Sequence, residues 1–130
     1  MKKFFLSLTM ILTYAACDPE SCVDEVLVNS TEIDLLINYV GSMDDSDQIL
    51  LKSDGTVSRG VLCAMGGVVV NNSIYDSIYI TTSTNDLLKV FKPDTPGKNI
   101  YNIDQYWTIR ETSKNHFEYT YTITNEDIGN

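Results

Sequence analysis

The sequence predicts an all-β fold: a single antiparallel β-sandwich of about seven or eight strands, Ig-like or transthyretin-like in general form. Short runs in which apolar and polar residues alternate recur along the chain, and this period of two is typical of strands with one buried face. Turn-forming residues separate the runs, and no window of a dozen residues after residue 16 has a convincing helical period. Many short strands spaced by turns favour a sandwich.

The first half of the domain contains four predicted strands, and the fourth breaks at 66–67 and resumes at 68–70. The clearest alternation covers 33–40, with an apolar residue at every second position. Turn or break signals at 44–47, 53–55 and 66–67 separate the runs. The predicted strands are 26–29, 33–40, 48–52 and 57–65 with 68–70.

The second half contains four more predicted strands, and the last of them has the clearest apolar face. Phe117, Tyr119, Tyr121 and Ile123 share that face, and the strand forms a predicted hairpin with its predecessor through 113–114. The region also contains a proline-rich loop at 93–98 and single helical turns within 99–105 and from residue 125. The predicted strands are 74–80, 87–92, 106–112 and 115–124.

The first 16 residues have the layout of a secretory signal peptide. Lys2 and Lys3 precede an uncharged, mostly apolar run that closes with Ala15 and Ala16. This run is shorter than the roughly 20 apolar residues that a membrane-spanning helix needs. We therefore expect residues 1–16 to be a leader and not a permanent anchor.

Cys17 distinguishes lipidation from ordinary secretion. Ala15-Ala16-Cys17 resembles the lipobox of bacterial lipoproteins, in which the cysteine sulfur receives a diacylglyceryl group before cleavage just upstream. Tyr14 departs from that motif, which usually has an aliphatic residue there. The alternative is plain secretion with cleavage after Ala15 or Ala16. The predicted organisation is a lipoprotein signal peptide at 1–16, a lipidated tether at 17–25 and a β-sandwich domain at 26–130.

The charge of the chain restricts its partners. The sequence has 18 acidic and 9 basic residues, and loss of the two leader lysines changes the net charge from −9 to 7 − 18 = −11. Such an acidic surface repels phosphate backbones and anionic headgroups, which argues against nucleic-acid binding. We expect membrane attachment through the lipid on Cys17, in the cell envelope and on the outer membrane, at its periplasmic face or at the cell surface.

Two further cysteines, Cys22 and Cys63, are available for pairing once Cys17 carries lipid. An exported compartment permits disulfides, and this one would close a loop of about 40 residues. The alternative is that Cys63, in the apolar run 61–65, is a free core thiol. Two cysteines and one distant histidine do not make a zinc site.

No set of residues indicates catalysis. The single histidine, His116, falls on the polar face of its predicted strand, and the sequence has neither a nucleophile elbow nor a Gly-rich phosphate loop. Asp44, Asp45 and Asp47 could offer oxygen ligands to calcium, but their spacing is not that of an EF-hand loop, and solvated turns are the alternative. We expect no enzyme activity, no cofactor and no metal.

Tyr75 and Tyr79 are the candidate binding residues. In a regular strand they share one face, opposite Ile74, Ile78 and Ile80, and exposed rings stack on sugars or anchor protein partners. The alternatives are that another element covers them, or that they are surface tyrosines without a partner. The expected function is to bind another envelope protein as an interaction or structural subunit. The alternative function is a surface glycan-binding module.

Three segments also carry a family resemblance. They are Val-Asn-Ser-Thr at 28–31, Tyr-Asp-Ser-Ile-Tyr-Ile at 75–80 and Tyr-Thr-Tyr-Thr-Ile-Thr-Asn-Glu-Asp at 119–127. Together they resemble small, largely uncharacterised lipoproteins of Bacteroidetes. Asn125 and Ile128 depart from the acidic and aromatic residues that usually end those proteins. The resemblance implies a β-rich envelope lipoprotein and supplies no catalytic residue.

Overall fold

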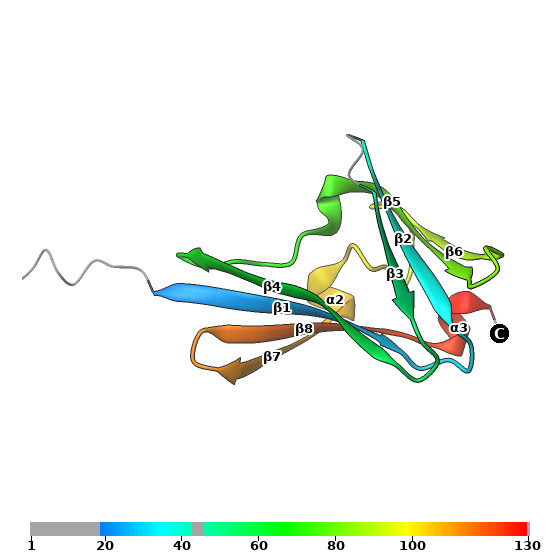
Figure 1. Cartoon of the computed structure of the whole chain (residues 1–130). Coiled ribbons are helices and arrows are strands. Elements are labelled where there is room, and N and C mark those ends of the chain that lie inside the picture. Colours follow the sequence, from blue (N-terminus) through cyan, green and yellow to red (C-terminus); the bar gives the residue numbers. More distant parts are fainter. Residues whose placement is uncertain (1–18, 43–45, 130) are drawn as a thin grey trace, which may run out of the picture.

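The computed structural model describes residues 19–42 and 46–129. The predicted leader, Cys17, Asp44 and Asp45 lie outside the described residues. Within them, eight strands form two four-stranded sheets packed face to face, which confirms the predicted β-sandwich (Figure 1).

Each sheet combines strands from distant parts of the sequence. The first sheet has the order β4-β1-β8-β7 and the second β3-β2-β5-β6. The first sheet consists of β4 (Thr56–Met65), β1 (Glu20–Asn29), β8 (His116–Ile123) and β7 (Thr108–Ser113). The second consists of β3 (Asp47–Leu51), β2 (Leu35–Gly41), β5 (Tyr75–Thr82) and β6 (Leu87–Phe91). The short helices are η2 (Asn72–Ile74), α2 (Ile103–Tyr106) and α3 (Asn125–Ile128).

The first strand corrects the predicted tether. β1 begins at Glu20, so residues 20–25 belong to the domain and the prediction of a tether at 17–25 is wrong from residue 20 onwards. This segment pairs with β4 on one side and with β8 on the other, and Cys22 and Val23 are buried. The sequence pattern did not indicate this part of the strand, because polar residues alternate there with the buried positions.

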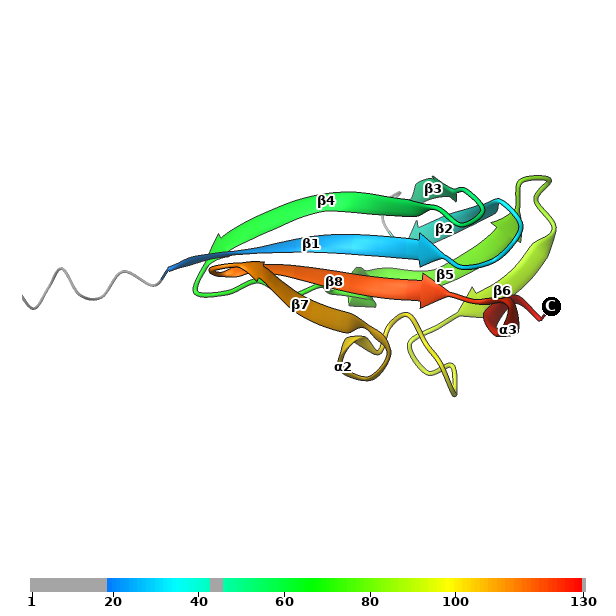
Figure 2. The same ribbon diagram turned by 90° about the horizontal axis from the view of Figure 1, so that it is seen from below.

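The pairing of β1 with β8 corrects a second expectation. These two strands run parallel, side by side in the middle of the first sheet, whereas the other pairs are antiparallel (Figure 2). The sandwich is therefore mixed and not purely antiparallel. The predicted hairpin between the last two strands is confirmed as β7–β8.

The predicted resumption of the fourth strand at 68–70 is wrong. Gly66 and Gly67 have positive φ angles, and the chain leaves the sheet after Met65. Val70 is instead buried in the core as part of a loop. A run of three valines has high β-propensity, but the glycines before it turn the backbone away from a partner.

The core lies between the inner faces of the two sheets. Fully buried side chains come from both layers, and the ring of Tyr121 contacts those of Phe91 and Trp107 at centroid distances of 6.3 Å and 5.3 Å. The Trp107 indole donates a hydrogen bond to the Ile100 carbonyl. The two predicted helical turns are present as α2 and α3, next to this aromatic group.

Candidate functional site

Tyr75 and Tyr79 lie on opposite faces of the second sheet. Tyr79 pairs with Asn38, but the register shifts so that Asp76 is an extra residue between the pairs made by Ser77 and Tyr75. This bulge turns Tyr75 inward, where its ring centroid is 5.0 Å from that of the buried Tyr39. The prediction that the two tyrosines stand side by side on one outer face is therefore wrong, because a bulge breaks the alternation.

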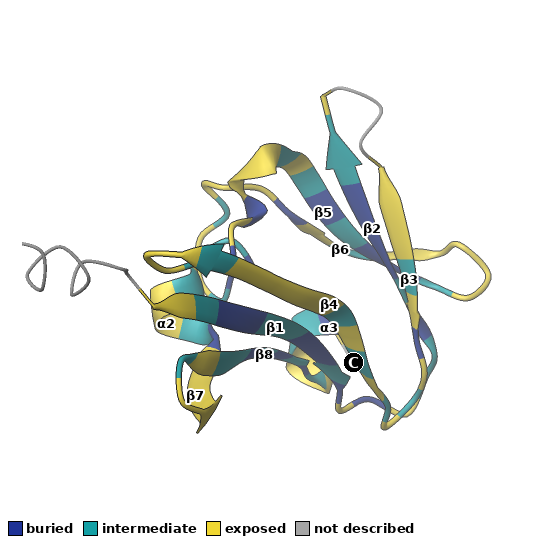
Figure 3. Cartoon of the chain, turned by 60° about the vertical axis from the view of Figure 1, so that its left-hand side comes forward, coloured by how far each residue is buried: buried dark blue, intermediate teal, exposed yellow. Residues whose placement is uncertain are grey.

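Tyr79 remains on the outer face of the second sheet, which we define as the face turned away from the first sheet (Figure 3). Two rows of side chains cross this face from strand to strand. One row is Gln48, Asn38, Tyr79 and Val90. The neighbouring row is Leu50, Leu36, Thr81 and Leu87.

The outer face presents exposed apolar side chains. Leu50, Leu87 and Val90 are exposed and Leu36 and Tyr79 half-buried, although all five lie on a regular sheet. Isolated exposed apolar residues are common on protein surfaces, whereas a contiguous group rimmed by polar residues is typical of a binding surface.

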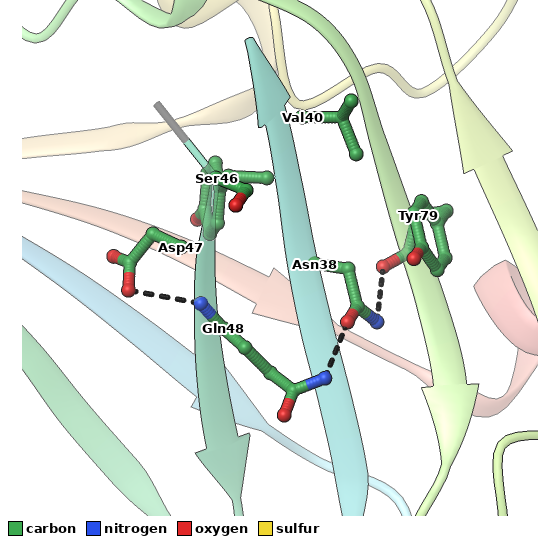
Figure 4. Close-up of a pocket in the computed structure, with 7 residues that line it drawn as sticks. Asn38, Val40, Ser46, Asp47, Gln48 and Tyr79 are labelled. Atoms are coloured by element: carbon green, nitrogen blue, oxygen red, sulfur yellow. Dashed lines mark hydrogen bonds between the residues drawn. The ribbon is translucent and has the colours of Figure 1, made fainter. Parts of the chain in front are cut away.

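A polar hollow of about 320 Å³ adjoins this apolar group (Figure 4). We call it the Tyr79 hollow. Within it the Gln48 side-chain amide donates to Asn38 Oδ1 at 2.6 Å, and the Asn38 amide donates to the Tyr79 carbonyl at 3.4 Å. The backbone N–H of Gln48 donates to Asp47 Oδ1. The lining residues are Asn38, Tyr39, Val40, Ser46, Asp47, Gln48 and Tyr79.

The Tyr79 hollow combines one aromatic ring, two amides and one carboxylate. Amides and carboxylates fix orientation through hydrogen bonds, and an aromatic ring supplies a flat contact surface. His116, the only histidine of the chain, is exposed on β8 in the other sheet. A hollow lined in this way can contact a ligand through hydrogen bonds and one aromatic ring.

Arg59 forms a polar cluster between the sheets that the sequence reasoning missed. Its guanidinium donates to Glu25 Oε1 at 2.8 Å and to the Tyr75 hydroxyl at 3.0 Å. The guanidinium carbon lies 3.9 Å from the centre of the Tyr39 ring, and Asp47 Oδ2 lies 3.6 Å from Nη2. We call these five residues the inter-sheet cluster.

The surroundings shift the pKa values of two members of the inter-sheet cluster, Arg59 and Tyr39. Burial alone lowers the pKa of Arg59, but Tyr39 and Glu25 outweigh it and raise the pKa above its ordinary value. Burial also raises the pKa of Tyr39, and Arg59 offsets only part of this effect. At neutral pH Arg59 is therefore charged and Tyr39 is neutral. The sequence does contain an arginine between two apolar strand positions, which could have indicated a buried charge. The alternation of apolar and polar residues does not reveal which residues contact it.

Cys22 and Cys63 are joined by a disulfide. The two residues pair directly across β1 and β4, so the bond connects the start of the domain to an edge strand. Cys63 is thus part of a disulfide and is not the free core thiol of the alternative interpretation.

The acidic turn offers no metal site in the part of the chain that the structure describes. Asp44 and Asp45 are outside that part, and Asp47 faces Arg59. No group of three His, Cys, Asp or Glu residues within 19–42 and 46–129 could hold a metal ion.

Comparisons with protein-family models, curated proteins and solved structures find no match to this chain. None of the helices among the described residues has the length and apolar character that crossing a membrane requires.

Proposed function

We propose that this chain is a non-enzymatic cell-envelope protein, lipid-anchored through Cys17 on the outer membrane, that binds another envelope protein as an interaction subunit. The proposal includes membership of the small Bacteroidetes lipoproteins that the sequence resembles. The signal-like residues 1–16 and the Ala-Ala-Cys motif support the anchoring. The outer face of the second sheet supports the binding.

The outer face has the composition expected of a protein interface. Leu36, Leu50, Leu87 and Val90 provide apolar contacts around Tyr79. Interfaces with protein partners commonly have an apolar, aromatic centre and a polar rim, and tyrosine is enriched among the residues that dominate affinity. The exposed leucines in the row beside Tyr79, Leu50 and Leu87, are the observation that carries this proposal.

A glycan is the second candidate ligand, and the Tyr79 hollow favours it. A sugar ring could stack on Tyr79 while its hydroxyls bond to the side-chain amide of Gln48. The hollow has a volume of about 320 Å³, at the small end of the range for ligand pockets. The two candidates use different residues of the same face, so substitutions separate them.

The test is a cross-linking pull-down of the tagged full-length protein from native membranes. We expect Leu50→Ser and Leu87→Ser to lose the cross-linked partner, because both place a hydroxyl in the apolar row. Ile109→Ser on β7 is the matched control, since Ile109 is 46% exposed and Leu50 is 47% exposed. The control should keep the partner, and Cys17→Ala should release the protein from the membrane.

Three outcomes contradict parts of the proposal. A partner that survives both leucine substitutions does not bind the outer face. Saturable binding to an envelope polysaccharide, lost in Tyr79→Ala but kept in Leu87→Ser, assigns the face to a glycan. A wild-type protein that is found in the soluble fraction excludes lipidation of Cys17.

A further inference from the structure

Exposed apolar side chains also occur in the second half of β4, on the first sheet, and in the loop that follows it. Val61, Leu62 and Met65 on β4 and Val69 in the following loop are 57% to 68% exposed. We call these four residues the apolar tip. β4 is an edge strand, so its end has a neighbour on one side only (Figure 1). An exposed apolar edge strand invites association unless something covers it.

The apolar tip lies where the chain enters the domain. Met65 pairs with Glu20 across β1 and β4, and the disulfide joins the next-but-one pair, Cys22 and Cys63. The two strand ends lie side by side in both ribbon views (Figures 1 and 2). Cys17 precedes Glu20 by three residues, and an extended chain spans at most about 3.6 Å per residue. A lipidated Cys17 is therefore held within roughly 11 Å of Glu20, the residue that pairs with Met65 of the apolar tip.

The β7–β8 turn lies at the same end of the molecule. The Cys22 N–H donates to the Asn115 carbonyl at 2.8 Å, which places this turn beside the start of β1. The turn also contains the exposed Lys114. A lysine beside an apolar group is typical of a surface at a lipid interface, where the ammonium reaches the headgroups.

We propose that the apolar tip inserts into the interfacial region of the bilayer that holds the lipid of Cys17. This inference rests on the proposed anchoring and adds an orientation to it. The end of the molecule that carries the starts of β1 and β8 and the end of β4 faces the membrane. Apolar burial carries the contact, because a mature charge of −11 repels anionic lipids.

The position of the tip favours a bilayer over a second copy or another protein. A surface within reach of an anchored residue meets the membrane at a high local concentration, whatever the abundance of soluble partners. The disulfide, which connects β1 to β4 next to the tip, keeps the tip at the anchored end of the molecule.

The test places a tryptophan in the tip and measures its contact with lipid. Leu62→Trp and, as its matched control, Leu87→Trp are made in the full-length protein, since Leu62 is 63% exposed and Leu87 is 62% exposed. The native Trp107 is buried and contributes a constant background. Each protein is reconstituted into phosphatidylcholine vesicles with or without bromine on the acyl chains.

We expect brominated phosphatidylcholine to quench the Leu62→Trp emission about twofold. In vesicles without bromine, the same emission should shift to shorter wavelength. Leu87→Trp should show neither effect. Val69→Trp, in the loop outside the strand, should repeat the Leu62→Trp result and guards against a local disturbance of β4. Equal quenching of Leu62→Trp and Leu87→Trp in vesicle-bound protein overturns the inference.

Flotation of the vesicles separates this inference from the proposed anchoring. Protein that does not float carries no lipid, which contradicts the anchoring. For protein that does not float, the free Cys17 thiol is coupled to maleimide-phosphatidylethanolamine in the same vesicles. The quenching comparison is then repeated, so that the orientation is tested even without natural lipidation. A concentration-dependent blue shift of Leu62→Trp in vesicle-free Cys17→Ala protein identifies a second copy as the occupant and also overturns the inference.

Discussion

Arg59 connects more parts of this molecule than any other residue described above. It lies on β4 of the first sheet, pairs with Glu25 of β1 and crosses the core to Tyr39, Tyr75 and Asp47 of the second sheet. A buried ion pair gains little net stability, because desolvation of both charges offsets their attraction. Loss of one partner is costly, since the other charge is then buried alone.

The first prediction at this scale concerns the stability of Arg59 variants. Arg59→Ala should lower the free energy of unfolding by about 3–5 kcal/mol, because it leaves Glu25 buried without a partner. Arg59→Met combined with Glu25→Leu should recover most of that loss, since apolar side chains then replace the ion pair and the remaining carboxylate, Asp47, is exposed to solvent. Urea unfolding measures both variants.

The control pair for this prediction is Arg110–Glu118 on the solvent side of β7 and β8. The Arg110 side chain is well exposed, so Arg110→Ala should cost less than about 1 kcal/mol. Equal losses for Arg59→Ala and Arg110→Ala would show that the inter-sheet cluster makes no special contribution.

The sequence indicated the strands that hold the cluster but not the cluster itself. Two of its residues, Arg59 and Tyr39, lie on predicted strands, and Glu25 lies in the predicted tether. No pattern of neighbouring residues in the sequence indicates that these three side chains meet. Their contact depends on the packing angle between two sheets and on the bulge at Gly60, which has a positive φ angle. The bulge at Asp76 likewise moved Tyr75 from the expected outer face to this cluster.

At the scale of the elements, the disulfide secures an edge strand. β4 pairs with β1 alone, and a bulge interrupts that pairing between Asp24 and Val26. The Cys22–Cys63 bond lies beyond the bulge, at the end that carries the apolar tip. It therefore cross-links to β1 the segment of β4 that lies beyond the bulge.

Removal of the disulfide should destabilise the protein by roughly 3–4 kcal/mol, as expected for a cross-link that closes a loop of this size. Urea unfolding of the oxidised protein and of the Cys22→Ser, Cys63→Ser double variant measures the difference. Cys17→Ala is the control and should unfold like the wild type, because it breaks no bond within the sheets. Amide exchange should rise first in residues 61–65.

Alternation and turn signals predicted most strands to within a few residues, and both helical turns. They failed where polar residues occupy a paired strand, as at the start of β1, and where apolar residues follow two glycines, as at 68–70. Both failures have the same physical origin. A strand exists only when a neighbour accepts its backbone hydrogen bonds, and that neighbour is distant in sequence.

At the scale of the whole molecule, buried tyrosines make the fold sensitive to alkaline pH. Burial raises the pKa of Tyr39 and Tyr121, and burial together with Asp76 raises the pKa of Tyr101 to about 12. In an unfolded chain a tyrosine titrates near 10. The folded state therefore favours the protonated phenols, and the unfolded state releases their protons at lower pH.

The sign of the pH dependence follows from these directions. The stability that the protonated phenols confer is fully present below about pH 10 and decreases as the pH rises from 10 towards 12 and above. We expect the urea midpoint to fall steeply in that range. In the folded protein, phenolate absorbance should show a late step, above pH 10, that coincides with loss of the far-ultraviolet circular dichroism of the strands. In the urea-unfolded chain the tyrosines should titrate near pH 10. A late step that precedes unfolding would contradict the assignment.

The order of the strands in each sheet was beyond prediction from the sequence. Period and turns identify strands and suggest hairpins, and the β7–β8 hairpin was found in this way. The division into two sheets and the parallel contact of β1 with β8 depend on which apolar faces meet over the core. Many pairings satisfy the same alternation, so only the assembled core selects among them.

The parallel pair has a consequence for how the chain reaches its native state. β1 has as one of its two neighbours a strand formed by residues 116–123. The centre of the first sheet stays open until these residues pair with β1, and contacts between such distant segments form slowly. Val23 and Leu27 remain unshielded during that interval. The folding chain is therefore vulnerable to proteases and to aggregation until β8 is in place.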